Sequence, residues 1–251
     1  MLDGNDPGER LRSLIEERES VGEVNLQDLE CALHNGDRVV VVVRHAERPP
    51  LEENDPTFGF NLPITDAGKV KAGVFGFALG EFSKGYEHRI HSSRTRRCRM
   101  TAQAISVEMD GVSAWGFILD EILGGASPYF GSVEDRMALA DKGDYLEALN
   151  EYFRTGHQSG FRDLTAATDA FEDYLWNGHP QLEAPLKVYV THDINVGCFL
   201  AGRGVVTCFE DHTWPHYLDA AVAFLGRNGH ARYGYLRTWE SRNSFDLMVT
   251  F

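Results

Sequence analysis

The residues best suited to chemistry fall in four polar clusters, and each cluster directly follows an apolar segment with the pattern of a strand. The first cluster follows five consecutive valines, at positions 39–43, which are too apolar and too β-branched to face water on either side. Polar residues at the carboxyl end of a buried strand lie where open α/β sheets bind their ligands. The four clusters are Arg44-His45, Ser92-Ser93 with Arg97, Asp120-Glu121, and His192-Asp193.

Together these side chains have the chemistry of phosphoryl transfer. The planar guanidinium of arginine is permanently charged and binds phosphate through paired hydrogen bonds. A histidine inside an arginine cluster can serve as nucleophile or base, while the arginines stabilise the oxygens of a transferring phosphoryl group. A carboxylic acid beside them can protonate a leaving alkoxide. Four arginines within six residues, at positions 94–99, indicate an anion site at a helix start, although they cannot all point the same way.

The elements that must position these clusters follow a strand–helix alternation. Strands are predicted at 38–43, 87–91, 114–119 and 186–190, and helices at 26–34, 65–82 and 194–200 and after Ser93. The apolar stripe of the helix at 65–82 is interpreted as core; it comprises Val70, Val74, Phe77, Ala78 and Phe82. Segments 220–225 and 231–236 flank Asn228-Gly229, which predicts a hairpin, and 244–251 is a candidate edge strand. In a parallel sheet the four clusters meet at one edge.

We therefore expect one α/β domain over residues 1–251, a three-layer sandwich with a mostly parallel central sheet flanked by helices. Residues 124–185 break the alternation, with many aromatic residues and helical segments near 132–140, 145–152 and 166–176. This segment is interpreted as a helical cap insertion over the pocket. The first 37 residues are interpreted as polar, with two short helices that pack on the sheet edge.

Composition excludes several classes of partner. The net charge of -14 argues against nucleic acid or an anionic membrane surface. The four cysteines have no C-x-x-C spacing, so no structural zinc site is expected. The ten histidines are too scattered for a metal-binding tract, and no metal or cofactor is predicted. The amino terminus has no apolar signal core, and no apolar run is long enough to span a membrane. These features predict a cytoplasmic protein with reduced thiols whose partner is a small molecule; the oligomeric state stays open.

Three of the clusters carry a family resemblance. Arg44-His45-Ala46-Glu47-Arg48-Pro49-Pro50 resembles the R-H-G-x-R-x-P signature of the histidine phosphatase superfamily, which has the phosphoglycerate mutase-like fold, and departs from it at Ala46. Ser92-Ser93, followed by Arg97-Cys98-x-x-Thr101-Ala102, resembles that family's second arginine motif. Thr191-His192-Asp193 resembles the His-Asp pair of its acid phosphatase branch. The resemblance covers about residues 38–240.

The resemblance implies a role for each matched residue. His45 is the nucleophile that becomes a phosphohistidine, and Asp193 is the general acid toward the leaving group. The side chains that bind the phosphoryl oxygens are Arg44, Arg48, Arg97 and His192. The branch that contains phosphoglycerate mutases places a glutamate acid after a middle strand, and Glu121 lies at a comparable place. Asp193 is favoured, because Arg48 and the His-Asp pair both match the acid phosphatase branch.

The leading interpretation is a phosphomonoester hydrolase, and three alternatives stay open. The first is a mutase-like phosphotransferase with Glu121 as proton donor. The second is a catalytically silent protein that binds a phosphate ligand. The third is a metal-dependent hydrolase using His45, His91, His192 and Asp193, which is disfavoured because the spacing of these four residues gives no H-x-x-x-H or C-x-x-C ligand pattern.

Overall fold

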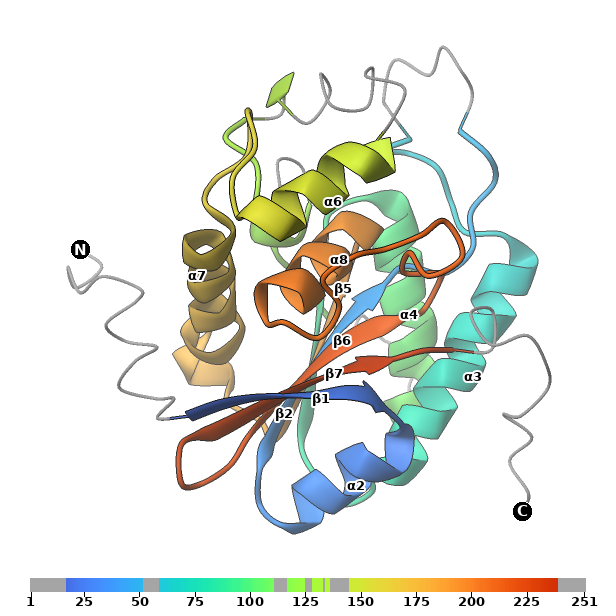
Figure 1. Ribbon diagram of the computed structural model, residues 1–251. Helices are drawn as coiled ribbons and strands as arrows, with labels where there is room; N and C mark the ends of the chain where they lie inside the picture. The colour runs from blue at the N-terminus through green and yellow to red at the C-terminus, as the bar shows by residue number, and fades with distance from the viewer. Residues whose placement is uncertain are drawn as a thin grey trace.

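The computed structural model describes residues 17–51, 59–110, 117–124, 128–132, 134–135 and 145–238. In this part of the chain seven strands form one sheet in the order β1-β7-β6-β2-β5-β3-β4 (Figure 1). The strands are β1 (Glu17–Val24), β2 (Arg38–Arg44), β3 (His88–Ser92), β4 (Phe117–Leu119), β5 (Leu186–Thr191), β6 (Ala220–Leu225) and β7 (His230–Leu236). Only β6 runs against its neighbours β2 and β7, so the predicted mostly parallel α/β sheet is confirmed.

Helices cover both faces of the sheet (Figure 1). They are α2 (Leu26–His34), α3 (Asp66–Phe82), α4 (Arg96–Asp110), α6 (Tyr145–Thr155), α7 (Leu164–Asn177) and α8 (Asp193–Gly202), with 3-10 turns η1 (Glu121–Leu123) and η2 (Pro180–Leu182). Buried residues of α2, α3 and α4 form one core, and those of α6, α7 and α8 form the other. No helix in the described residues is long and apolar enough to cross a lipid bilayer.

Strand β2 belongs to both cores, because successive side chains of a strand point to opposite faces. Val39, Val41 and Val43 pack in the core with α2, α3 and α4, whereas Val40 and Val42 pack in the core with α7 and α8. All five valines are fully buried. The two-sided burial inferred from the valine run is therefore the central feature of this three-layer structure.

Helix α3 buries a different face from the one predicted. Val70, Val74 and Phe77 are exposed, so their assignment to the core is wrong. The inner face instead carries Gly68, Ala72, Phe75, Gly76 and Leu79. A side chain at Gly76 would lie 2.5 Å from the Ile105 carbonyl oxygen of α4. The backbones of α3 and α4 thus approach closely because Gly76 has no side chain. The apolar pattern used to predict the core gives no information on such a contact.

Strand β1 was not predicted. It pairs in parallel with β7 at the sheet edge, and all of its residues except Val24 are exposed or half-buried. An edge strand held by backbone hydrogen bonds needs no alternation of apolar and polar residues, so the charged sequence of β1 did not indicate a strand. The predicted helix near Leu11–Ile15 and the candidate strand at 244–251 lie outside the described residues.

Helices α6 and α7 occupy the described parts of segment 124–185, close to where helices were predicted. Tyr152, Phe171 and Trp176 are buried in the same core as Val40 and Val42 of the central strand. The helix predicted near 132–140 falls mostly outside the described residues. A role for this segment as a cap over the pocket stays a prediction.

The close contact between α3 and α4 predicts that two neighbouring glycines differ in their tolerance of alanine. Gly76→Ala places a methyl group against the α4 backbone, and such overpacking lowers the free energy of unfolding by about 1–3 kcal/mol. Gly73→Ala is the matched control, because its methyl group would meet only the Glu108 side chain at 3.4 Å. It gains helix propensity of roughly 0.5–1 kcal/mol. Urea unfolding followed by circular dichroism measures both; equal effects would contradict the assigned packing.

Candidate active site

The carboxyl ends of the parallel strands β2, β5 and β3 lie level with one another. Arg44 pairs with Thr191 in the register of β2 and β5, and Ser92 pairs with Val190 in that of β3 and β5. The ladder extends one residue beyond β2, where the His45 amide donates to the Thr191 carbonyl at 2.9 Å. The sequence-predicted meeting of these strand ends at one edge is confirmed.

The imidazole of His45 is buried and held in one tautomer. Its Nδ1 lies 2.8 Å from the Ala46 carbonyl oxygen, which can only accept, so Nδ1 carries the hydrogen. Its Nε2 receives a hydrogen bond from Nε of Arg97 at 3.0 Å. The lone pair of Nε2 therefore faces the guanidinium, so an anion bound by Arg97 would lie beside this nitrogen.

Arg97 lies in the first turn of α4 and bridges the two histidines. Its Nη2 donates to Nδ1 of His192 at 3.2 Å, and its Nη1 donates to the Gly59 carbonyl at 2.5 Å. Because Nδ1 of His192 accepts, its Nε2 carries the hydrogen and donates to Ser93 Oγ at 3.3 Å. The centroids of the His45 and His192 rings are 5.6 Å apart. One buried cation thus lies between two neutral imidazoles.

Arg44 and Asp193 form a second charged pair beside His45. Arg44 Nη2 lies 3.1 Å from Asp193 Oδ2, and Nη1 donates to the Pro215 carbonyl at 2.5 Å. Asp193 begins α8, and its carboxylate also accepts from the Ile194 amide at 2.8 Å. Its side chain is 31% exposed, so the carboxylate is accessible from solvent.

The other two predicted site residues have contacts elsewhere. Arg48 is half-buried and donates to the Pro49 carbonyl at 2.8 Å. Glu121 lies in η1, where its side chain is 76% exposed and pairs with Arg94 at 3.0 Å. The structure brings together five predicted residues, namely Arg44, His45, Arg97, His192 and Asp193, and it places Glu121 in the solvent-exposed pair with Arg94.

Sequence reasoning missed Tyr217, which is part of the cluster. The Arg44 guanidinium lies 4.4 Å from the centre of its ring, and the ring centroids of Tyr217 and His45 are 5.7 Å apart. The loop before β6 is held by the Leu218 amide, which donates to the Arg44 carbonyl at 3.2 Å. Leu218 has a φ of 66°, a strained value for a branched side chain. The only sequence signal is the position of Tyr217 just before β6.

The environment sets the charge of each group in the cluster. Burial, followed by the guanidiniums of Arg97 and Arg44, holds the pKa of His45 well below 6.5, so the imidazole is neutral at neutral pH. Burial opposes ionisation of Asp193, but the Arg44 guanidinium and the hydrogen bond from the Ile194 amide outweigh it and lower the pKa of the carboxyl. Burial raises the pKa of the Cys98 thiol to about 11, so this neighbour of His192 stays protonated.

These contacts suit the binding and attack of an oxyanion. Two guanidiniums supply positive charge, the neutral Nε2 of His45 supplies an electron pair, and the Asp193 carboxyl can exchange a proton. His91, which the metal-dependent alternative would need here, instead contacts Asp120 at 2.7 Å. Among the described residues, the group of three side chains able to hold a metal ion comprises His91, Asp120 and His179, and it includes none of the five clustered residues.

The buried cation predicts how His45 titrates. Nuclear magnetic resonance of the imidazole ring against pH should give a pKa below 6.5, the ring staying neutral until the solution is more acidic than that. In Arg97→Ala the pKa should rise toward 6.5, because a guanidinium that disfavours the imidazolium is gone. Arg96→Ala removes an exposed arginine from the same turn and should leave the titration unchanged. A wild-type pKa at or above 6.5 would contradict the assigned electrostatics.

Comparison with known proteins gives distant likenesses. No family model and no curated protein matches the chain. The chain is similar to a mycobacterial glucosyl-3-phosphoglycerate phosphatase at 16% identity, covering 79% of this chain and 97% of that one with a TM-score of 0.49. It is also similar to the ecdysone phosphate phosphatase of Bombix mori, at 13% identity, covering 83% and 95% with a TM-score of 0.44.

A third solved structure, of the protein histidine phosphatase SixA with tungstate, is 14% identical and covers 78% of this chain and 93% of that one, with a TM-score of 0.38. All three of these proteins are phosphatases. At these identities and TM-scores the likenesses leave the function of the chain to be inferred from the geometry of its own site.

Proposed function

We propose that the protein is a phosphomonoester hydrolase that acts through a phosphohistidine intermediate on His45. The observation that carries this proposal is the guanidinium of Arg97, which donates to Nε2 of His45 and to Nδ1 of His192. A buried cation that touches the lone pairs of two neutral imidazoles lies where an incoming oxyanion would be attracted and attacked. The substrate is a small phosphomonoester.

In the first step, Nε2 of His45 attacks the phosphorus atom, a nitrogen–phosphorus bond forms and the bond to the leaving oxygen breaks. The nitrogen needs no base, because the low pKa of His45 keeps it unprotonated and Nδ1 already carries the hydrogen that bonds to Ala46. Arg44, Arg97 and His192 contact the phosphoryl oxygens and stabilise their charge in the transition state. Arg48 joins them once its side chain turns from the Pro49 carbonyl.

Asp193 supplies the proton that the leaving oxygen takes up. In the free protein Arg44 holds this carboxyl in its ionised form. A bound phosphoryl group competes for Arg44 and adds negative charge nearby, and both effects raise the carboxyl pKa toward the protonated form. In the second step the Asp193 carboxylate accepts a proton from water as the water attacks phosphorus and releases His45.

Glu121 is the donor in the alternative reading, a mutase-like phosphotransferase. Asp193 is favoured because its carboxylate contacts Arg44, the residue next to His45, whereas Glu121 pairs with Arg94 in solvent. A silent phosphate-binding protein would retain the arginines but would not need His45 held as a neutral tautomer. A metal-dependent hydrolase is disfavoured because His91 contacts Asp120; activity that persists in EDTA would support this choice.

The proposal predicts that phosphate is transferred to His45. Brief reaction with a labelled substrate should give an acid-labile phosphoprotein, with the label on the peptide that contains His45. His45→Ala should abolish both labelling and turnover of p-nitrophenyl phosphate. His157→Ala is the control, because that side chain is 76% exposed and lies on the surface. Acid-stable label, or label on a serine or aspartate, would refute the assignment.

The two candidate proton donors, Asp193 and Glu121, can be distinguished by how the loss of rate in each variant depends on the leaving group. An alkoxide must be protonated as it departs, whereas nitrophenolate leaves unaided. Asp193→Asn should therefore slow alkyl phosphates by about 10²–10⁴-fold, the usual worth of general acid catalysis, and slow p-nitrophenyl phosphate much less. Glu121→Gln should show no such dependence. If the pattern is reversed, Glu121 is the donor and the mutase-like alternative gains support.

A further inference from the structure

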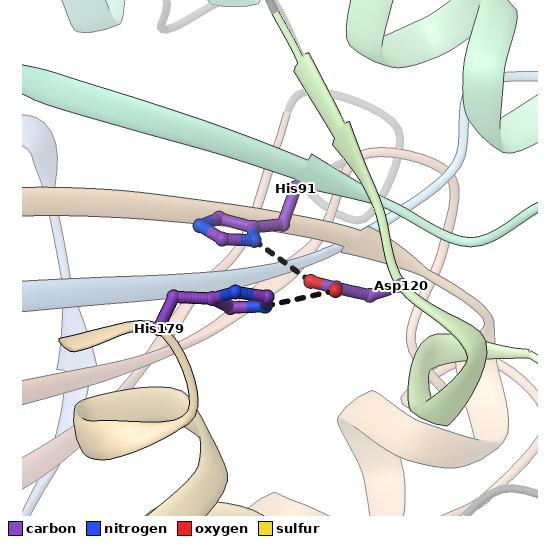
Figure 2. A group of neighbouring side chains, drawn as sticks. All are labelled: His91, Asp120 and His179. Carbon is purple, nitrogen blue, oxygen red and sulfur yellow. Dashed lines mark hydrogen bonds and ion pairs between the residues drawn. The ribbon is translucent and has the colours of Figure 1, made fainter. Parts of the chain in front are cut away.

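A second group of facing side chains comes from the β3–β4 edge of the sheet. His91 lies on β3, Asp120 directly follows β4, and His179 precedes η2 (Figure 2). His91 Nδ1 is 2.7 Å from one oxygen of the Asp120 carboxylate, and His179 Nε2 is 2.9 Å from the other. The carboxylate thus bridges two imidazoles, and none of the three residues takes part in the proposed phosphatase chemistry.

The group is buried but borders on solvent. His91 is fully buried, Asp120 is 4% exposed, and the His179 side chain keeps 25% of its exposure, which gives a small ion a way in. The ring of Tyr189 stacks on His91 with centroids 4.5 Å apart, and the Tyr174 hydroxyl lies 2.9 Å from His179 Nε2. Packing on one side and a hydroxyl on the other leave the rings little freedom.

We propose that His91, Asp120 and His179 bind a divalent transition-metal ion, with Zn²⁺ the best match. One atom from each residue, two imidazole nitrogens and one carboxylate oxygen, lies within 4.8 Å of the others. Two histidines and one carboxylate form a common zinc ligand set, with a fourth position left for water. The three ligands come from separate parts of the chain, so the ion would tie strand β3 to the residue that follows β4 and to the turn before η2.

Ion binding needs only small shifts and a movement of protons. Tetrahedral zinc with bonds of about 2.0–2.1 Å separates its ligand atoms by roughly 3.3 Å, so the present 2.7 and 2.9 Å contacts must lengthen slightly. Each ligating nitrogen must give up the hydrogen it donates to Asp120, either to solvent or to the other ring nitrogen. His91 Nε2, which is buried without a hydrogen-bond partner among the described residues, can take up that hydrogen.

The surrounding charges are compatible with a cation. The Asp120 carboxylate is the acidic group of the site, and each of its oxygens contacts a nitrogen of one histidine, His91 or His179. Lys187 is the nearby cation, and its Nζ is engaged by the Trp176 carbonyl at 2.9 Å and by Glu183 at 3.2 Å.

The test is a titration of the full-length, chelator-treated protein with Zn²⁺ alone by calorimetry, and with Co²⁺ by visible absorption. We expect one equivalent to bind tightly, Co²⁺ to give the intense bands of a four- or five-coordinate ion, and Zn²⁺ to raise Tm. Loss of a residue that only hydrogen-bonds to a metal ligand lowers metal affinity by about 10–100-fold, and loss of a ligand itself should cost at least as much. His179→Ala should therefore weaken the Kd for Zn²⁺ by about 100-fold or more, and so should His179→Gln, which keeps a donor to Asp120.

Two controls separate this site from others. His157→Ala removes an exposed histidine, and His45→Ala removes one from the phosphatase cluster; both should bind Zn²⁺ as the wild type does. The proposal is overturned if the wild type binds neither ion, if both His179 variants bind normally, or if His45→Ala abolishes binding. Phosphatase turnover after chelation is expected to persist, so failure of the metal site and failure of the proposed hydrolase give different results.

Discussion

The burial of β2 on both faces is the constraint on which the rest of the structure depends. Five fully buried valines each gain about 1.5–3 kcal/mol by leaving water, but only if helices cover both sides of the strand. That requirement imposes three layers around β2, which lies between β6 and β5 in the sheet. The same burial leaves the end of β2 as the first point where charged side chains can emerge, and Arg44 and His45 stand there.

The His45 cluster places positive charge at one point of an acidic molecule. Burying the guanidinium of Arg97 costs free energy, and the Gly59 carbonyl and two imidazoles offset part of that cost by accepting its hydrogen bonds. An anion that enters this cluster replaces weak neutral partners with a charged one. The net charge of -14 disfavours anion binding elsewhere on the protein, so a phosphate would bind preferentially at this cluster.

The edge of the sheet carries two groups of opposite character. Around His45, arginines outnumber the single carboxylate of Asp193, which suits an oxyanion. Around Asp120, a carboxylate lies between two neutral or donating imidazoles, which suits a cation (Figure 2). The two groups are linked through β3, because His91 is followed directly by Ser92 and by Ser93, whose hydroxyl accepts from His192. A cation bound by His91, Asp120 and His179 would therefore stabilise strand β3, which also supports the His45 cluster.

Local pattern alone determined most of the framework. The valine run specified β2, Thr65 specified the start of α3, and the polar residues after the predicted strands marked the edge where the His45 cluster forms. These features rest on interactions between near neighbours in the chain, such as the hydrogen bond from the Gly68 amide to Thr65 Oγ1 at 2.9 Å. Such short-range rules can be applied to a sequence without knowing which distant segments meet.

Only the tertiary structure decided which side chains meet. Arg97 was one of four arginines in a short stretch, and the packing of α4 turned it inward while Arg94 stayed in solvent with Glu121. The inner face of α3 was set by how closely another helix could approach its glycines. His91, Asp120 and His179 are separated by 29 and 59 residues, so no local motif joins them. Contacts across the chain depend on strand order and helix packing, which spacing along the sequence does not encode.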